Sequence, residues 1–231
     1  MIKKSYLIFQ GTIWVVFLCL DLLPNSPERF SDPLKYCGLL SCLGFVILHR
    51  KQADPIDWHQ LFWGLALTCG CDYFLLFTDS AFFPLLIFAG VHVIYSHRNF
   101  PQIQKKIVLA YVGGALLLLL GIQQKWSYSP FSSGLFYAVF LLTDVISTFR
   151  SQHPKRQLLQ VALLLFLLCD ITVAAFNLFP GSTQRLVGPL MWFFYFPAQV
   201  LLSRSAAPLQ LKKKTAAWRY GALSTKCGVK E

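Results

Sequence analysis

The chain has 231 residues, of which 55% are hydrophobic and 13% are charged, and its formal net charge is +11. Soluble domains carry about 25% charged residues, so this composition excludes an ordinary soluble protein and indicates a membrane protein. Membrane topology can account for an excess of positive charge, so the charge does not call for a nucleic-acid partner.

Eight apolar runs follow one another along the chain. A helix that spans a bilayer needs about 20 apolar residues, and runs of roughly 17 to 25 are usual. We therefore predict an all-α polytopic bundle of about eight transmembrane helices in residues 1–204, followed by a basic cytoplasmic tail in residues 205–231. The expected helices are Ser5–Leu23, Leu34–His49, Trp58–Phe77, Phe82–His97, Ile107–Ile122, Phe131–Phe149, Leu158–Asn177 and Leu186–Leu202.

The basic residues fall mainly on one side of this arrangement. With eight helices, 17 of the 21 Lys and Arg residues lie on the side of the two termini. The positive-inside rule then predicts that both termini are cytoplasmic. No small-x-small cleavage pattern follows Leu23, so we expect the first helix to be retained. The four basic residues on the other side are Arg29, Lys35, Lys125 and Arg185.

The seven cysteines show no paired CxxC spacing, and most fall within the expected helices. Small buried hydrophobic residues are the default interpretation of such cysteines. We therefore predict neither a metal site nor a disulfide framework. No nucleotide-binding loop is visible, and no cofactor is expected.

Three acids lie inside the expected helices: Asp72, Asp144 and Asp170. A charged side chain at the centre of a transmembrane helix costs about 2.5–3.5 kcal/mol, so such residues mark functional candidates. Asp144 is close to the cytoplasmic end, where Arg150 or Lys155 could pair with it. Asp72 and Asp170 have no such neighbour and are the main candidates.

Polar residues recur at helical spacing on five helices, which is typical of a lined interior cavity. Such residues also form simple hydrogen bonds between helices, which remains the alternative for most of them. The stripes are Gly64, Thr68 and Asp72; His92, Tyr95 and Ser96; Tyr137, Asp144 and Thr148; Asp170, Ala174 and Asn177; and Trp192, Tyr195, Gln199 and Ser203.

Asp72 and Asp170 are expected at a similar depth in the membrane. With a rise of ~1.5 Å per residue, Asp72 and Asp170 lie roughly 8 and 10 Å from the outer ends of their helices. We therefore expect them to share one layer. Lys35 enters the membrane from the same side, where it could offset one carboxylate or bind a phosphate. The dipeptide Cys-Asp occurs at 71–72 and again at 169–170, and this short internal similarity suggests that the chain has two related halves.

At these positions the chain resembles the YhhN-like lysoplasmalogenase family. The similarity covers most of the chain in the correct order, on an eight-helix plan. The chain departs from the family pattern at Cys71, where Gly is usual, at Cys169, where Ser is usual, and at Pro197. The segments that carry the resemblance are DPLK (32–35), GLALTCGCDYFL (64–75), FAGVHVIY (88–95), LLFLLCDITVA (164–174) and YFPAQVLL (195–202).

The resemblance implies hydrolysis of the vinyl ether bond of a lysoplasmalogen, which releases a fatty aldehyde and glycerophospho-ethanolamine or glycerophospho-choline. Such chemistry needs one protonated carboxyl group and one carboxylate, as in glycosidases. Asp72 and Asp170 can supply both roles, although their order is open. We expect His92 and Tyr195 to position water or relay protons and Lys35 to bind the headgroup phosphate. The further supporting candidates are Tyr95, Tyr137 and Gln199.

Two other functions fit the same residues. Intramembrane acids in related halves are also typical of small proton-coupled transporters. A catalytically silent protein that binds lysolipid is the third alternative. The membrane would be the cell membrane in a bacterium and an endoplasmic-reticulum-type membrane in a eukaryote. Besides membrane lipids, a lysophospholipid is the expected partner, while the headgroup preference and the oligomeric state are open.

Overall fold

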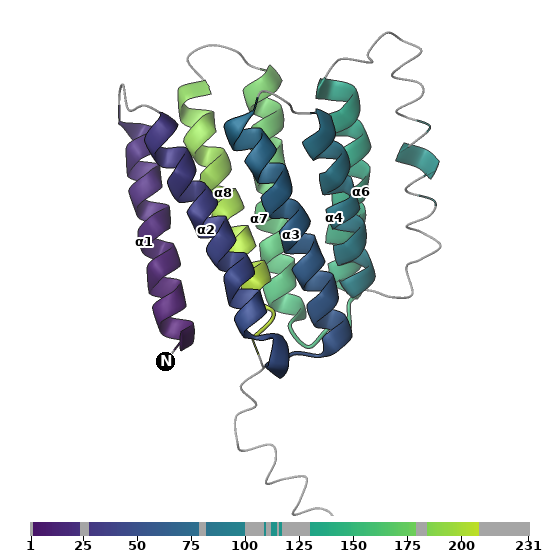
Figure 1. The fold of residues 1–231 in the computed structure, drawn as a ribbon. Coiled ribbons are helices and arrows are strands. Elements are labelled where there is room, and N and C mark those ends of the chain that lie inside the picture. The colour runs from purple at the N-terminus through teal and green to yellow at the C-terminus, as the bar shows by residue number, and fades with distance from the viewer. Residues whose placement is uncertain are drawn as a thin grey trace, which may run out of the picture.

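The computed structural model describes residues 2–23, 28–78, 82–99, 130–178 and 184–207, together with a few residues between 109 and 116. Every regular element in these ranges is a helix, which confirms the all-α prediction for this part of the chain (Figure 1). The elements are α1 (Ile2–Leu22), α2 (Glu28–Leu48), the short 3-10 helix η1 (Arg50–Gln52), α3 (Pro55–Phe77), α4 (Phe82–Asn99), α6 (Pro130–Arg150), α7 (Arg156–Leu178) and α8 (Gln184–Arg204).

Seven of the eight predicted helices match these α-helices closely. The largest difference is α2, which begins at Glu28 rather than Leu34 and contains Pro33. Proline disfavours helix interiors but is tolerated near a helix start, so the prediction began after it. Lys35 bonds Ser31 and Asp32 across this first part of α2, and these bonds support the earlier start. Most of the expected helix Ile107–Ile122 and residues 208–231 of the expected tail lie outside the described residues.

Four of the described helices are long and apolar enough to cross a membrane. They are α1, α2, α3 and α7, with candidate spans Lys4–Leu22, Phe30–Leu48, Pro55–Phe77 and Arg156–Phe176. Large hydrophobic side chains such as Ile8, Leu48 and Trp63 are exposed on the outer surface of the bundle. Such a surface suits hydrocarbon better than water. The total of eight spans and the cytoplasmic position of the termini stay predictions.

The helices stand side by side in one bundle (Figure 1). Contacts follow chain order from α1 to α4 and from α6 to α8, and α4 packs against α6. The last helix closes the arrangement, because α8 contacts α1, α2 and α3 as well as α7. Six helices, α2, α3, α4, α6, α7 and α8, thus enclose a common core, and α1 lies against α2 and α8.

One end of this bundle, here called the basic end, holds the starts of α1, α3 and α7 and the ends of α4 and α8. The hydroxyl groups of Tyr6 in α1 and Ser203 in α8 are 2.7 Å apart. Arg98 in α4 forms a bidentate ion pair with Asp57 in α3, with N···O distances of 2.6 and 3.0 Å. The predicted common direction of the third and seventh helices is therefore confirmed, because α3 and α7 both start here.

Candidate active site

Asp72 lies on the buried face of α3 and faces α8. Tyr195 donates a hydrogen bond to Asp72 Oδ2 at an O···O distance of 2.5 Å. Asp72 is 3% exposed, and the ring of Tyr195 packs against Trp192 and Phe166. The carboxyl group therefore sits in an apolar, aromatic environment with one polar partner from the neighbouring helix.

Asp170 in α7 is partly buried and lies at one end of a chain of polar groups whose other members are buried. Tyr137 in α6 donates a hydrogen bond to Asp170 Oδ2 at 2.6 Å, and the same hydroxyl is 3.1 Å from Nε2 of His92 in α4. His92 Nδ1 is 3.0 Å from Asp144 Oδ2 in α6, and both residues are fully buried. Asn99 at the end of α4 donates to Asp144 Oδ1 at 3.0 Å. The chain runs from the middle of the bundle toward the basic end.

This geometry allows a proton to move between Asp144 and Asp170. When Tyr137 donates to Asp170, its oxygen can accept from His92 Nε2–H, and His92 Nδ1 then shares a proton with Asp144. Passing one proton along the chain leaves Asp170 protonated and donating to Tyr137. Tyr137 then donates to Nε2, and Nδ1–H donates to Asp144. Each group keeps its hydrogen bonds in both states, because tyrosine and imidazole can each donate and accept.

The two acids occupy one packed core, but each binds its own tyrosine. The ring of Phe166 in α7 contacts Tyr195 on one side, with centroids 5.2 Å apart, and His92 on another, at 5.1 Å. Phe166 therefore contacts the partner of Asp72 and the chain that leads to Asp170. The expectation that the two acids share one layer stays a prediction.

The remaining predicted site residues lie nearby in different roles. Gln199, one helical turn after Tyr195, is fully buried, and its side-chain nitrogen and oxygen have no hydrogen-bond partner among the described residues. A buried amide without partners is costly, so a polar ligand or water is its natural complement. Tyr95 packs its ring onto Gly64, where an added Cβ would lie 2.3 Å from Tyr95 Cε1. Tyr95 therefore fixes the approach of α3 to α4.

Lys35 binds carboxylates other than the two site acids. Its Nζ is 3.1 Å from Asp21 of α1 and 2.9 Å from Asp32 of α2. The same Nζ lies 5.1 Å from the ring centroid of Trp192, which in turn packs against Tyr195. Lys35 is thus two aromatic rings away from Asp72, in a group of two acids and one base.

One sequence interpretation is wrong. Asp144 does not pair with Arg150 or Lys155 but binds His92 and Asn99 inside the bundle. Lys155 instead donates to the carbonyl groups of Ser205 and Ala207, where it caps the end of α8. The role of Asn99 was missed, although His92, Ser96 and Asn99 share one helical face at i, i+4 and i+7.

The described part of the chain contains no cluster of three or more His, Cys, Asp or Glu residues that could hold a metal ion. Cys71 and Cys169, which flank the two acids, are buried free thiols. The sulfur of Cys71 lies 3.6 Å from the carbonyl oxygen of Pro84 in α4.

The YhhN family model matches residues 33–206, which include the three intramembrane acids and the predicted supporting residues, whereas Asp21 and Asp32 lie outside the match. The chain belongs to the YhhN family. This is the family of lysoplasmalogenases, so the resemblance noted from the sequence motifs is confirmed. Neither a curated protein nor a solved structure matches the chain significantly. The match begins within α2, so α1 lies outside it. Family membership and the four apolar helices together indicate a membrane protein of the lysoplasmalogenase type.

Proposed function

We propose that the protein hydrolyses the vinyl ether bond of a lysoplasmalogen by acid–base chemistry of Asp72 and Asp170. The observation that carries the proposal is the placement of both acids in one apolar core, each bound to a tyrosine that can orient it. Family membership supplies the substrate class. The acids supply a proton donor and a carboxylate without a metal.

The reaction needs one proton and one water molecule. A protonated carboxyl group transfers its proton to the outer alkene carbon, and the electron pair of the double bond forms the new C–H bond. The resulting oxocarbenium ion is stabilised by the second carboxylate, which also takes a proton from the attacking water. The hemiacetal then breaks its C–O bond: the second carboxyl group gives its proton to the departing glycerol oxygen, and the hemiacetal hydroxyl releases one proton, which balances the proton that the first acid regains. The products are a fatty aldehyde and the glycerol hydroxyl group, and one water is consumed. This division of labour parallels that of glycosidases.

The hydrogen-bonded chain from Asp144 makes Asp170 the better connected of the two acids. Asp144, His92 and Tyr137 can return a proton to Asp170 after each turnover without exposing the core to water. In this scheme Asp170 donates the proton to the alkene carbon, and Asp72 stabilises the cation and activates water. Gln199, which has buried amide atoms beside Tyr195, contacts the glycerol backbone or the water.

The cluster around Lys35 suits the headgroup. Lys35 can bind the phosphate as a point charge, and Asp21 and Asp32 can bind the ammonium group of ethanolamine or choline. Both carboxylates already lie within 3.1 Å of Lys35, so the cluster carries one net negative charge. A zwitterionic headgroup complements such a cluster better than an anionic one.

The deciding experiment is release of aldehyde from a defined lysoplasmalogen by the purified protein in detergent. We expect turnover by the wild type and its loss in Asp72→Asn and in Asp170→Asn. Asp54→Asn is the matched control, because Asp54 caps α3 outside the site and Asn caps helices equally well. Full activity of either site variant would refute the proposal. Detergent removes any proton gradient, so turnover there also separates a hydrolase from a proton-coupled transporter.

A further inference from the structure

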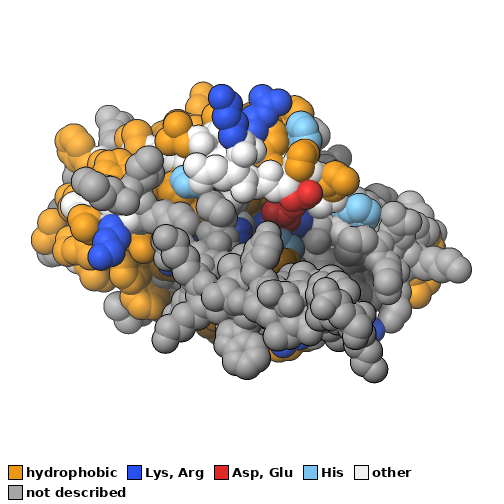
Figure 2. All heavy atoms as spheres, turned by 90° about the horizontal axis from the view of Figure 1, so that it is seen from below, with side chains coloured by type: hydrophobic (Ala, Val, Ile, Leu, Met, Phe, Trp, Pro, Cys, Tyr) orange, Lys and Arg blue, Asp and Glu red, His pale blue; other side chains and the backbone are white. Residues whose placement is uncertain are grey.

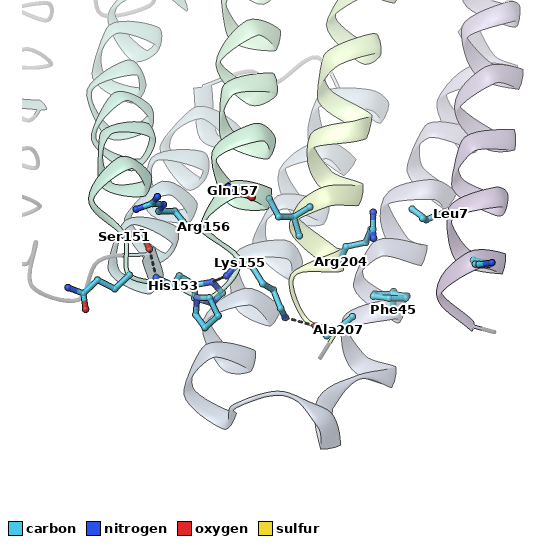
Figure 3. Close-up of a pocket in the computed structure, with 13 residues that line it drawn as sticks. Leu7, Phe45, Ser151, His153, Lys155, Arg156, Gln157, Arg204 and Ala207 are labelled. Carbon is cyan, nitrogen blue, oxygen red and sulfur yellow. Dashed lines mark hydrogen bonds between the residues drawn. The ribbon is translucent and has the colours of Figure 1, made fainter. Parts of the chain in front are cut away.

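A cavity of about 790 Å³ opens at the basic end of the bundle, away from the two site acids. Figure 3 shows that it is bounded by the start of α1, the end of α2, the end of α8 and the beginning of α7. The link between α6 and α7, residues 151–155, forms another side. None of the groups in the proposed reaction lines this cavity.

The cavity is strongly cationic. Lys4, Lys155, Arg156 and Arg204 all line it, and no Asp or Glu occurs among its lining residues. Figure 2 looks onto this end of the molecule and shows its acidic side chains gathered in one place, apart from several basic ones. His153 also lines the cavity, but it bonds Asp57 through Nε2.

Among the described residues, one of the four cations, Lys155, has a protein partner that explains its position. Lys155 donates to the carbonyl groups of Ser205 and Ala207. This contact is favourable because the end of α8 carries partial negative charge. The structure gives no ion pair to Lys4, Arg156 or Arg204 within its described residues. Three positive charges therefore gather around one cavity without a carboxylate to offset them.

The start of α7 adds to this charge. Its first turn contains no acidic residue, and it begins with Arg156, directly after Lys155. The start of a helix carries partial positive charge and unpaired N–H groups, so basic residues there are unfavourable. An anion at this position would offset both the helix dipole and the arginine. Lys155 and Arg156 thus favour a negatively charged ligand near the start of α7, although they do not stabilise the helix by themselves.

The walls of the cavity also include apolar side chains. Leu7 of α1, Phe45 of α2 and Leu158 of α7 line it beside the cations. Leu7 and its neighbours Ile8 and Phe9 are exposed on the outer surface of α1, which is a candidate membrane span. A ligand that enters here therefore meets cations at its head and hydrocarbon along its side. That combination fits a lipid better than a soluble anion.

We propose that this cavity binds the phosphate-bearing headgroup of an anionic phospholipid, with Arg156, Arg204 and Lys4 on the phosphate. The simple alternative is that these residues only set membrane topology. Topology requires positive charge on one side of the membrane but not its convergence on one cavity. Lys51 and Arg150 are exposed basic residues outside the cavity lining, so variants at these positions serve as the control for variants at the cavity.

The test is thermal unfolding of the purified full-length protein in a neutral detergent during titration with short-chain phosphatidylglycerol. We expect the Tm to rise with this lipid, to stay unchanged with phosphatidylcholine of the same chain length, and to change little with inorganic phosphate. The double variant Arg156→Gln/Arg204→Gln should weaken the apparent affinity for phosphatidylglycerol about 30-fold, from the usual contribution of each basic residue near a lipid surface.

The control variant Lys51→Gln/Arg150→Gln removes the same charge and should retain the wild-type affinity. Equal weakening in both double variants would overturn the proposal, because overall charge would then explain the binding. A full Tm shift with inorganic phosphate alone would also overturn it in favour of a soluble anion. If the first double variant does not fold, Lys4→Gln at the exposed start of α1 tests the same site. None of these readouts uses turnover, so they stand apart from the proposed hydrolysis.

Discussion

The hydroxyl group of Tyr137 joins Asp170 to His92, so Tyr137→Phe removes one oxygen from the middle of the buried chain. The aromatic ring stays, and with it the packing against Phe88, whose centroid is 6.2 Å from that of Tyr137. Two hydrogen bonds disappear, one of 2.6 Å to Asp170 and one of 3.1 Å to His92. The substitution therefore tests the connection rather than the shape of the core.

Two magnitudes follow from this geometry. Leaving a buried polar group without its partner costs about 1–3 kcal/mol of the free energy of unfolding. Proton transfer by a positioned group contributes about 10²–10⁴-fold to rate, so kcat should fall by at least about 100-fold. KM should change little, because Tyr137 is assigned to the proton path and not to the headgroup.

The assay measures aldehyde release over a range of lysoplasmalogen concentrations, with thermal unfolding recorded on the same preparation. Tyr73→Phe is the matched control, because Tyr73 is exposed on α3 next to Asp72 and loses the same oxygen. A folded Tyr137→Phe protein with wild-type kcat would refute the assigned proton path. A fall in kcat equal to that of Tyr73→Phe would refute it too, since the effect would then not depend on the chain.

Asp144→Asn should keep the hydrogen bonds around His92, but the amide cannot hold the transferable proton. In the aldehyde assay kcat should therefore fall about 100-fold with KM little changed. Wild-type turnover would contradict the proton path. Gly64→Ala should lower the Tm, because its Cβ would lie 2.3 Å from the Tyr95 ring, whereas Gly70→Ala in the same helix meets no atom within 4 Å and should not lower it. Asp21→Asn should raise KM for ethanolamine lysoplasmalogen without lowering kcat, and an unchanged KM would exclude Asp21 from headgroup binding.

Hydropathy and charge predicted most of the fold because each helix is a long apolar run between short polar links. Polar residues at helical spacing also identified the residues that meet in the core, including Asp72, His92 and Tyr195. These patterns work for single helices, since spacing along one helix fixes which side chains share a face.

Pairing between helices was harder to predict. Asp144 stands close in sequence to Arg150 and Lys155, and a surface pair with them was the simplest expectation. The packing of α4 against α6 instead brings it to His92, 52 residues earlier in the chain. Lys35 shows the same limit, because its partner Asp21 belongs to a different helix. Such contacts depend on which helices become neighbours, and residue spacing along one helix does not show this.

The polar contacts of α1 bear on the order in which the bundle is completed. Gln10 donates to the Gly38 carbonyl and to Ser41 in α2, the next helix to be synthesised. Tyr6 pairs with Ser203 in α8, the last described helix. Chains are made from the N-terminus, so the bonds of the Gln10 amide nitrogen and the contact of Tyr6 with Cys42 in α2 can form early, while the bond of Tyr6 to Ser203 forms only after α8 is made. The hydrogen bond between Tyr6 and Ser203 is thus a late step of assembly, and it forms when the first helix packs against the last described helix.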